Sequence, residues 1–153
     1  MQYSQGTVGR IFALKLETGE RLPDAVEDFA LEHGVRSAIA IYVGGAGAAS
    51  RLVVGPEEGR ADDIVPILHT LGGIHEVLGV GTLFVDENGR PKLHMHAAAG
   101  REGKAVVGCT RAGLEAWLVG EVVLLEISGI GGVRQKDPKT GFQMLQFSDP
   151  SET

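Results

Sequence analysis

Two histidines and the only cysteine of the chain lie close together in the stretch LHMHAAAGREGKAVVGC, which runs from residue 93 to residue 109. Side chains along a β-strand point alternately to its two faces, so His94 and His96 would share one face. Two imidazole nitrogens and a thiolate sulfur suit zinc, and a trigonal set of two histidines and one cysteine is also typical of copper electron-transfer sites. The residue types therefore favour a metal site formed by His94, His96 and Cys109.

The pairing of two strands decides whether these three side chains can meet on one ion. If residues 100–103 form a hairpin loop, the ladder places His94 opposite Cys109 and His96 opposite Val107. Directly opposed Cβ atoms lie about 5 Å apart, which is close enough for shared coordination. A slip of one residue would turn Cys109 to the opposite face. In the alternative interpretation, the histidines form a half-exposed polar face and the cysteine is a small buried hydrophobe.

Three protein ligands leave one position of a tetrahedral site open. His75 and Glu76, at the start of the preceding strand, are candidates for a further ligand or a general base, and so are Glu121 and Glu126 as ligands. A neighbouring copy of the chain is another source of a ligand. We expect a divalent metal, zinc above others, although copper, iron and nickel also suit these ligand types. With water in the open position, the alternative function is a metal-dependent enzyme of the hydrolase or lyase type.

The remaining patterns predict one helix among a series of strands. An apolar stripe at i, i+4, i+7 and i+8 begins at Leu22 and predicts a helix that ends at Gly34. The run SAIAIYV, residues 37–43, predicts a strand covered on both faces. Short segments separated by turn residues indicate an α+β fold, a mainly antiparallel sheet with one principal helix packed on it. Strands are expected over 10–16, 37–43, 51–55, 63–68, 76–85, 93–99, 105–109, 121–127 and 141–147, and a loop over 129–140.

Length and charge bear on organisation and partners. The 153 residues indicate a single domain, with a core at about 8–147 and a flexible tail at 148–153. The formal net charge of −6 disfavours DNA as a partner, because basic side chains that neutralise phosphates supply most non-specific affinity. No signal-peptide pattern begins the chain, and no apolar run approaches the roughly 20 residues of a membrane span. We therefore expect a cytoplasmic protein with no membrane partner.

Several segments, taken in order, resemble the PPC domain, "plants and prokaryotes conserved". The motif of that family is a His-x-His strand followed by Gly-Gly-His, and its counterparts here are Leu93-His-Met-His96 and Val106-Val-Gly-Cys109. The segment Glu121-Val-Val-Leu-Leu-Glu126 then follows the family pattern. Residues 10–16 and 76–81 and the helix up to Gly34 are also similar to it, so the resemblance covers most of the chain.

The resemblance implies a small α+β domain that assembles as a homotrimer, with the His-x-His strand near the subunit contacts. Plant members carry an AT-hook and bind AT-rich DNA, whereas stand-alone prokaryotic members are often named as DNA-binding proteins, and some hold a metal at the histidines. This sequence contains no AT-hook, and it has Cys109 where the family has its last histidine. Val107 replaces a family glycine. The implied function is a metal-binding, trimeric PPC-domain protein with a binding or regulatory role.

Overall fold

β-Strands dominate the computed structural model, which describes residues 1–58 and 64–147. In chain order its elements are β1 (Thr7–Leu16), β2 (Arg21–Leu22), α1 (Asp24–Glu32), β3 (Ser37–Ala46), β4 (Arg51–Pro56), β5 (Pro66–Thr70), β6 (His75–Asp86), β7 (Pro91–Arg101), β8 (Lys104–Cys109), the 3-10 helix η1 (Thr110–Ala112), β9 (Leu114–Ser128), β10 (Gly132–Lys136) and β11 (Gln143–Phe147). Within the described residues the fold is a mainly antiparallel sheet with one short α-helix, which confirms the expected fold class.

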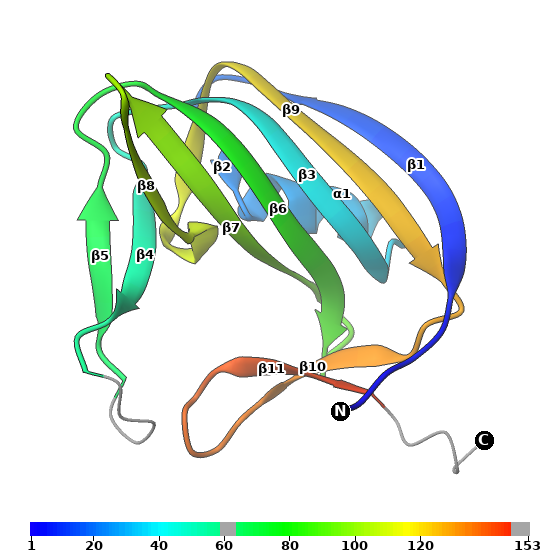
Figure 1. Ribbon diagram of the computed structural model, residues 1–153. Helices are drawn as coiled ribbons and strands as arrows, with labels where there is room; N and C mark the ends of the chain where they lie inside the picture. The colour runs from blue at the N-terminus through cyan, green and yellow to red at the C-terminus, as the bar shows by residue number, and fades with distance from the viewer. Residues whose placement is uncertain (59–63, 148–153) are drawn as a thin grey trace.

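The main path of the sheet runs in the order β1-β9-β3-β6-β7-β8-β4-β5. Every pair on this path is antiparallel, while β10 lies parallel to β6 and antiparallel to β11. Figure 1 shows a strongly curved sheet, with the β4–β5 hairpin along one side and the β10–β11 hairpin below it. The histidine strand β7 and its partner β8 thus lie between these two hairpins.

The helix covers one face of the sheet and holds β7 in place. Val26 and Ala30, which belong to the predicted apolar stripe, are fully buried among core residues. On the same helix, the carboxylate of Glu27 accepts a hydrogen bond from the backbone N–H of Leu93 at 2.9 Å and pairs with Lys92 Nζ at 2.9 Å. The start of the histidine strand is therefore tied to α1 by charged hydrogen bonds as well as by packing.

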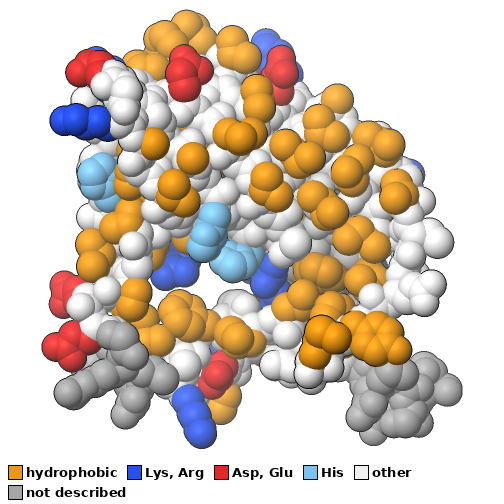
Figure 2. Space-filling view, viewed as in Figure 1, with side chains coloured by type: hydrophobic (Ala, Val, Ile, Leu, Met, Phe, Trp, Pro, Cys, Tyr) orange, Lys and Arg blue, Asp and Glu red, His pale blue; other side chains and the backbone are white. Residues whose placement is uncertain are grey.

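The opposite face of the sheet, here called the outer face, carries apolar side chains that one chain leaves exposed. Figure 2 shows them spread over the strands that face the viewer. The strand predicted over 37–43 to be covered on both faces is covered on one only, since Ile39 and Val43 are 37% and 48% exposed. This prediction was wrong for a single chain. The exposed apolar residues of the outer face include Ile39, Val43, Leu78, Val80, Val107 and Val123, and the half-buried Ile41 lies among them.

Other differences from the predicted elements lie towards the C-terminus. β9 is longer than expected, and β10 occupies part of the segment 129–140 that was predicted to be a loop. The sequence of β10, GVRQK, lacks a clear alternation, and its pairing with β6 and β11 determines its conformation. The strand expected over 63–68 corresponds to β5, which begins at Pro66. Residue 63 and the predicted tail at 148–153 lie outside the described residues.

In the described part of the chain, no helix has the length and apolar character that crossing a membrane requires.

Candidate metal centre

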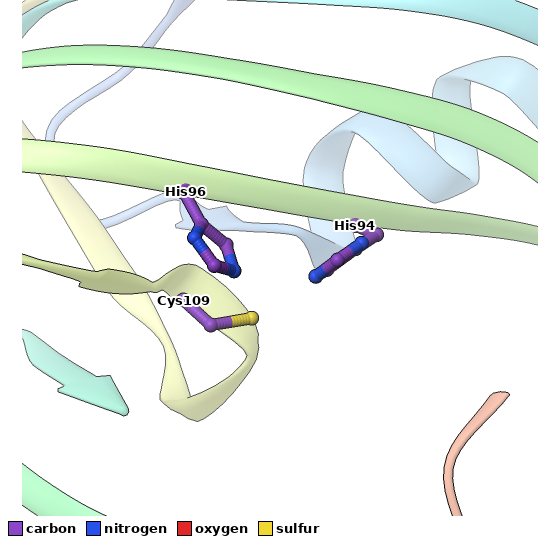
Figure 3. Close-up of side chains that lie close together, drawn as sticks. All are labelled: His94, His96 and Cys109. Atoms are coloured by element: carbon purple, nitrogen blue, oxygen red, sulfur yellow. The ribbon is translucent and has the colours of Figure 1, made fainter. Parts of the chain in front are cut away.

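The three predicted ligands come together on the outer face. His94 and His96 project from β7, and Cys109 ends β8. Their ligand atoms all lie within 4.8 Å of one another, and they form the one such His/Cys/Asp/Glu group among the residues that the structure describes. Figure 3 shows the Cys109 side chain directed toward the two imidazole rings. The rings meet edge to face, with centroids 5.0 Å apart, so neither stacks over the other's nitrogens.

The pairing that produces this group differs from the predicted one. His96, not His94, lies opposite Cys109, because the turn at Glu102 and Gly103 is two residues long. Both turn residues have positive φ, 52° and 75°, as a type I′ hairpin turn requires, so the ladder extends to the residues on either side of the turn. The predicted register was therefore wrong by two residues. An even shift leaves every side chain on its face, so Cys109 still joins the histidines.

Cys109 has a protected position in this arrangement. It lies between His96 on β7 and Val53 on β4 in the ladder, and it is 3% exposed. On the main path of the sheet, Val80 of β6 lies opposite His96 on the other side. The thiol is thus buried, while the two imidazole rings are accessible from the outer face.

The donor set fits a zinc ion. With Zn–N bonds of about 2.0–2.1 Å and a Zn–S bond of about 2.3 Å, tetrahedral geometry places the ligand atoms roughly 3.3–3.6 Å from one another. The ligand atoms observed within 4.8 Å need to approach by about 1 Å, which side-chain torsions can supply. His94, His96 and Cys109 would then be the protein ligands, and the fourth position would remain open to a further group.

Burial and nearby positive charges favour the neutral form of His94. Burial lowers the pKa of His94, and the positive charges of Arg134, His96 and Arg111 lower it further. The neutral imidazole is the form that binds a metal. Arg134 is itself 4% exposed, and its guanidinium donates hydrogen bonds to the carbonyl oxygens of Thr82 and Lys92 at 2.9 and 3.2 Å.

The additional candidates lie away from this group within one chain. Thr82 of β6 pairs with His94, whereas Glu76 pairs with Gly100 at the other end of the ladder. Val80, the partner of His96, marks the nearer end of the site, and the four residues of strand from there to Glu76 span about 13 Å. His75 is one residue further, and its Nδ1 lies 2.9 Å from the Gly73 carbonyl oxygen. His75 and Glu76 therefore do not reach the ion site of their own chain.

The two other glutamates are also placed elsewhere. Glu126 forms an ion pair of 2.7 Å with Arg10 on β1. Glu121 lies on β9 opposite Val43 of β3, and both β3 and β6 separate β9 from β7. Neither carboxylate belongs to the cluster of ligand atoms.

The structure adds residues that the sequence patterns did not single out. A cavity of about 430 Å³ adjoins His96 and Cys109, and Arg111 and Phe142 line it. The Arg111 guanidinium lies over the Phe142 ring, 5.4 Å from its centroid. These two residues come from η1 and from the segment before β11, so no local sequence pattern connects them with the histidines. In Figure 2, basic side chains flank the histidines in a hollow of the outer face.

Solved structures share this fold. A metal-containing protein from Archaeoglobus fulgidus matches with a TM-score of 0.81 at 23% identity, over 97% of this chain and 100% of that chain. A PPC protein from Pyrococcus horikoshii matches with a TM-score of 0.82 at 22% identity, over 97% and 99%. A protein from Bacteroides thetaiotaomicron, named a "putative DNA binding protein", matches with a TM-score of 0.74 at 19% identity, over 95% and 96%. At these identities the likeness establishes the fold.

Sequence comparison gives the family. No curated protein matches the chain. The family model of the Plants and Prokaryotes Conserved (PCC) domain, also abbreviated PPC, matches residues 3–128. These residues run from before β1 to the last residue of β9 and include β7 and β8, which carry the histidines and the cysteine. Since the match spans most of the chain, the chain belongs to the PPC domain family.

Proposed function

We propose that the chain binds a divalent metal, zinc above others, through His94, His96 and Cys109, and that it acts as a homotrimer with a binding or regulatory role. The observation that carries the proposal is the convergence of two imidazoles and a thiol within 4.8 Å on one face of the sheet. The name of the Archaeoglobus fulgidus neighbour, a metal-containing protein, supports the metal. Cys109 would bind the cation as its thiolate.

The outer face supports self-association. Val123, Ile41, Val80 and His96 follow one another across β9, β3, β6 and β7, so three apolar residues lead directly to a proposed ligand. Val80 and its neighbour Leu78 are 56% and 57% exposed in a single chain. A contiguous apolar surface of this kind is typical of a protein–protein interface. Other copies of the chain are the proposed partners, and the number of three comes from the family resemblance.

A binding role agrees better with the site than hydrolysis does. A hydrolytic mechanism needs a general base within hydrogen-bond reach of the metal-bound water. Glu76, one of the candidates for that base, lies about 13 Å along β6 from the position opposite His96, and His75, the other, is one residue further away. We therefore assign the metal to ligand binding or to structural support.

DNA association receives little support from charge. Two structural neighbours are named "putative DNA-binding", but this chain has a net charge of −6, which a trimer would multiply. Arg134, on β10 of the C-terminal hairpin, is buried and bonded to backbone carbonyls, so it cannot contact phosphates. We expect duplex DNA to bind weakly, with little dependence on salt concentration. Tight binding that weakens steeply with salt would contradict this expectation.

Native mass spectrometry beside elemental quantification tests the proposed function. Untagged protein purified without added metal should be a trimer that carries one ion per chain. Cys109→Ser and His94→Ala should lose the metal, because each removes a ligand. His75→Ala is the matched control, since it removes an imidazole from the distant end of the neighbouring strand, and it should keep the metal. A metal-free trimer, or equal metal content in His94→Ala and His75→Ala, would overturn the proposed site.

A further inference from the structure

The cavity beside the candidate metal centre has the size and lining of a small-molecule site. Its volume of about 430 Å³ falls within the range of roughly 300–1,000 Å³ that ligand pockets occupy. It lies between β4, β8 and the segment that precedes β11. The proposed ligands His96 and Cys109 form part of its wall, so an ion held there would face the cavity. The open position of that ion would be accessible to a molecule in the cavity.

Among the residues that the structure describes, the wall of the cavity combines apolar surface with one basic group. Val53, Val107 and Phe142 contribute apolar side chains, and Arg111 contributes a guanidinium. A guanidinium stacked on an aromatic ring uses its face, whereas its five N–H donors lie in its plane. The position of Arg111 over Phe142 therefore suits it to bind an oxygen of a ligand with its edge. Glu58 also lines the cavity and is the acidic side chain among its described lining residues.

The charges around the ion favour an anion as its fourth ligand. Two neutral imidazoles and one thiolate leave a divalent cation with a net positive charge. Arg111 lines the same cavity as His96 and Cys109, and Arg134 is hydrogen-bonded to Thr82, the ladder partner of His94, so two further positive charges lie beside the same site. An anionic ligand would be attracted by all three cationic groups, whereas a water molecule would compensate none of them.

The two arginines have different environments. Arg134 is buried, and its hydrogen bonds to Thr82 and Lys92 fix the guanidinium in the structure. Arg111 is exposed and lines the cavity itself. Arg134 would therefore act on a ligand through its charge, and Arg111 through direct hydrogen bonds. One such donor group beside apolar walls suits a carboxylate with a hydrocarbon part better than a phosphate, because the additional phosphate oxygens would lie against apolar side chains without hydrogen-bond partners.

We propose that the open position of the metal and Arg111 together bind the carboxylate of a small organic acid, whose hydrocarbon part lies against Val53, Val107 and Phe142. One carboxylate oxygen completes the coordination of the ion and the other accepts hydrogen bonds from the guanidinium. This inference rests on the proposed metal site and adds the chemical class of its ligand. A binding protein for an organic acid would then detect that acid through its metal.

Cobalt(II) in place of zinc makes the ligand visible, because its absorption spectrum reports both thiolate coordination and a change of the fourth ligand. The cobalt-loaded full chain is titrated with acetate, butyrate and inorganic phosphate in separate experiments. We expect both carboxylates to change the spectrum and butyrate to bind about tenfold more tightly than acetate, because two more methylene groups are buried. Phosphate should bind more weakly than butyrate.

Two variants and a matched control identify the residues. Arg111→Gln should weaken butyrate binding at least about tenfold, the loss expected for one charged hydrogen-bond partner. Its spectrum before the titration should equal that of the wild type, since Arg111 is no ligand. Phe142→Ala should remove most of the preference of butyrate over acetate. Arg90→Gln, an exposed arginine in the turn between β6 and β7, should change neither result.

The outcomes separate this inference from the proposed function. A chain that takes up no cobalt, or whose spectrum lacks the thiolate signature, overturns the metal site and this inference together. A chain that binds cobalt through Cys109 but does not respond to either carboxylate overturns the ligand class alone. Equal butyrate affinity in Arg111→Gln and Arg90→Gln overturns the role of Arg111. Tighter binding of phosphate than of butyrate assigns the site to a phosphate group instead and overturns the carboxylate.

Discussion

Gly81 of β6 lies where two strands approach so closely that a methyl group has no room. A Cβ at this position would meet the carbonyl oxygen of His94 at 2.6 Å and the Cβ of Met95 at 2.7 Å. Both neighbours belong to β7, the histidine strand, and neither is the flexible end of a side chain. In Gly81→Ala the strands must separate by several tenths of an ångström, which strains the ladder beneath His94. Overpacking of this kind destabilises by about 1–3 kcal/mol.

Thermal and urea unfolding at one fixed protein concentration measure the effect, because association makes apparent stability depend on concentration. For a chain of this length, a loss of about 1–3 kcal/mol lowers Tm by roughly 2–12 °C. The matched control is Gly100→Ala on β7, where the added Cβ would meet its nearest atom at an ordinary 3.7 Å. We expect the control to remain within about 1 kcal/mol of the wild type. If Gly81→Ala were as stable as Gly100→Ala, the close approach of β6 and β7 would not constrain the fold.

Two further predictions concern pH and assembly. Hydrogen bonds from Arg10, opposed in part by burial, lower the pKa of Glu126 from an ordinary value of 4.5 to about 2. The ionised carboxylate therefore stabilises the fold fully above about pH 4.5, and this contribution disappears as the pH falls through about 2. Glu126→Gln should therefore lower the free energy of unfolding by about 1 kcal/mol at pH 7, as expected for an ion pair whose Arg10 side chain is half exposed. In urea unfolding, the difference between the variant and the wild type should shrink below pH 4.5. A constant difference down to about pH 2 would contradict the assignment. Val80→Asp should dissociate the trimer in analytical ultracentrifugation because it places a charge on the outer face, while Leu31→Asp, on an exposed position of α1, should not. Dissociation by both variants, or by neither, would remove the outer face as the interface.

Much of the site could be predicted because it depends on local rules. The alternation of side chains along a strand places His94 and His96 on one face whatever the partner strand does. The position of Cys109 depended on a turn whose length the glycines at 100 and 103 left open. The predicted loop had four residues and the structure has two, at Glu102 and Gly103. The cysteine still lies at the site because the predicted and the observed pairings differ by two residues, and an even difference keeps each side chain on the same face of the sheet.

The residues around the candidate metal centre could not be predicted in the same way. Arg111, Phe142 and Val53 reach one cavity from η1, from the segment before β11 and from β4. Their proximity depends on long-range pairing, above all on β4 beside β8. Nothing in the spacing of these residues has the period of a strand or a helix, so only the folded chain could reveal them. The same applies to β10, whose pairing with β6 and β11 determines a strand that its composition does not indicate.

The wrong prediction for β3 carries information about assembly. An unbroken apolar run predicts a strand with both faces covered, yet Ile39 and Val43 are exposed in the single chain. An apolar run over residues 37–43 is consistent with the structure if other copies of the chain cover the outer face, because β3 would then be covered on both faces in the assembly. Because Val80 lies opposite both Ile41 and His96, the same surface would end at the proposed metal ligands. Association would then reduce the exposure of His96 to water and strengthen the electrostatic attraction of the site for an anion. Metal, ligand and assembly are thus expected to stabilise one another.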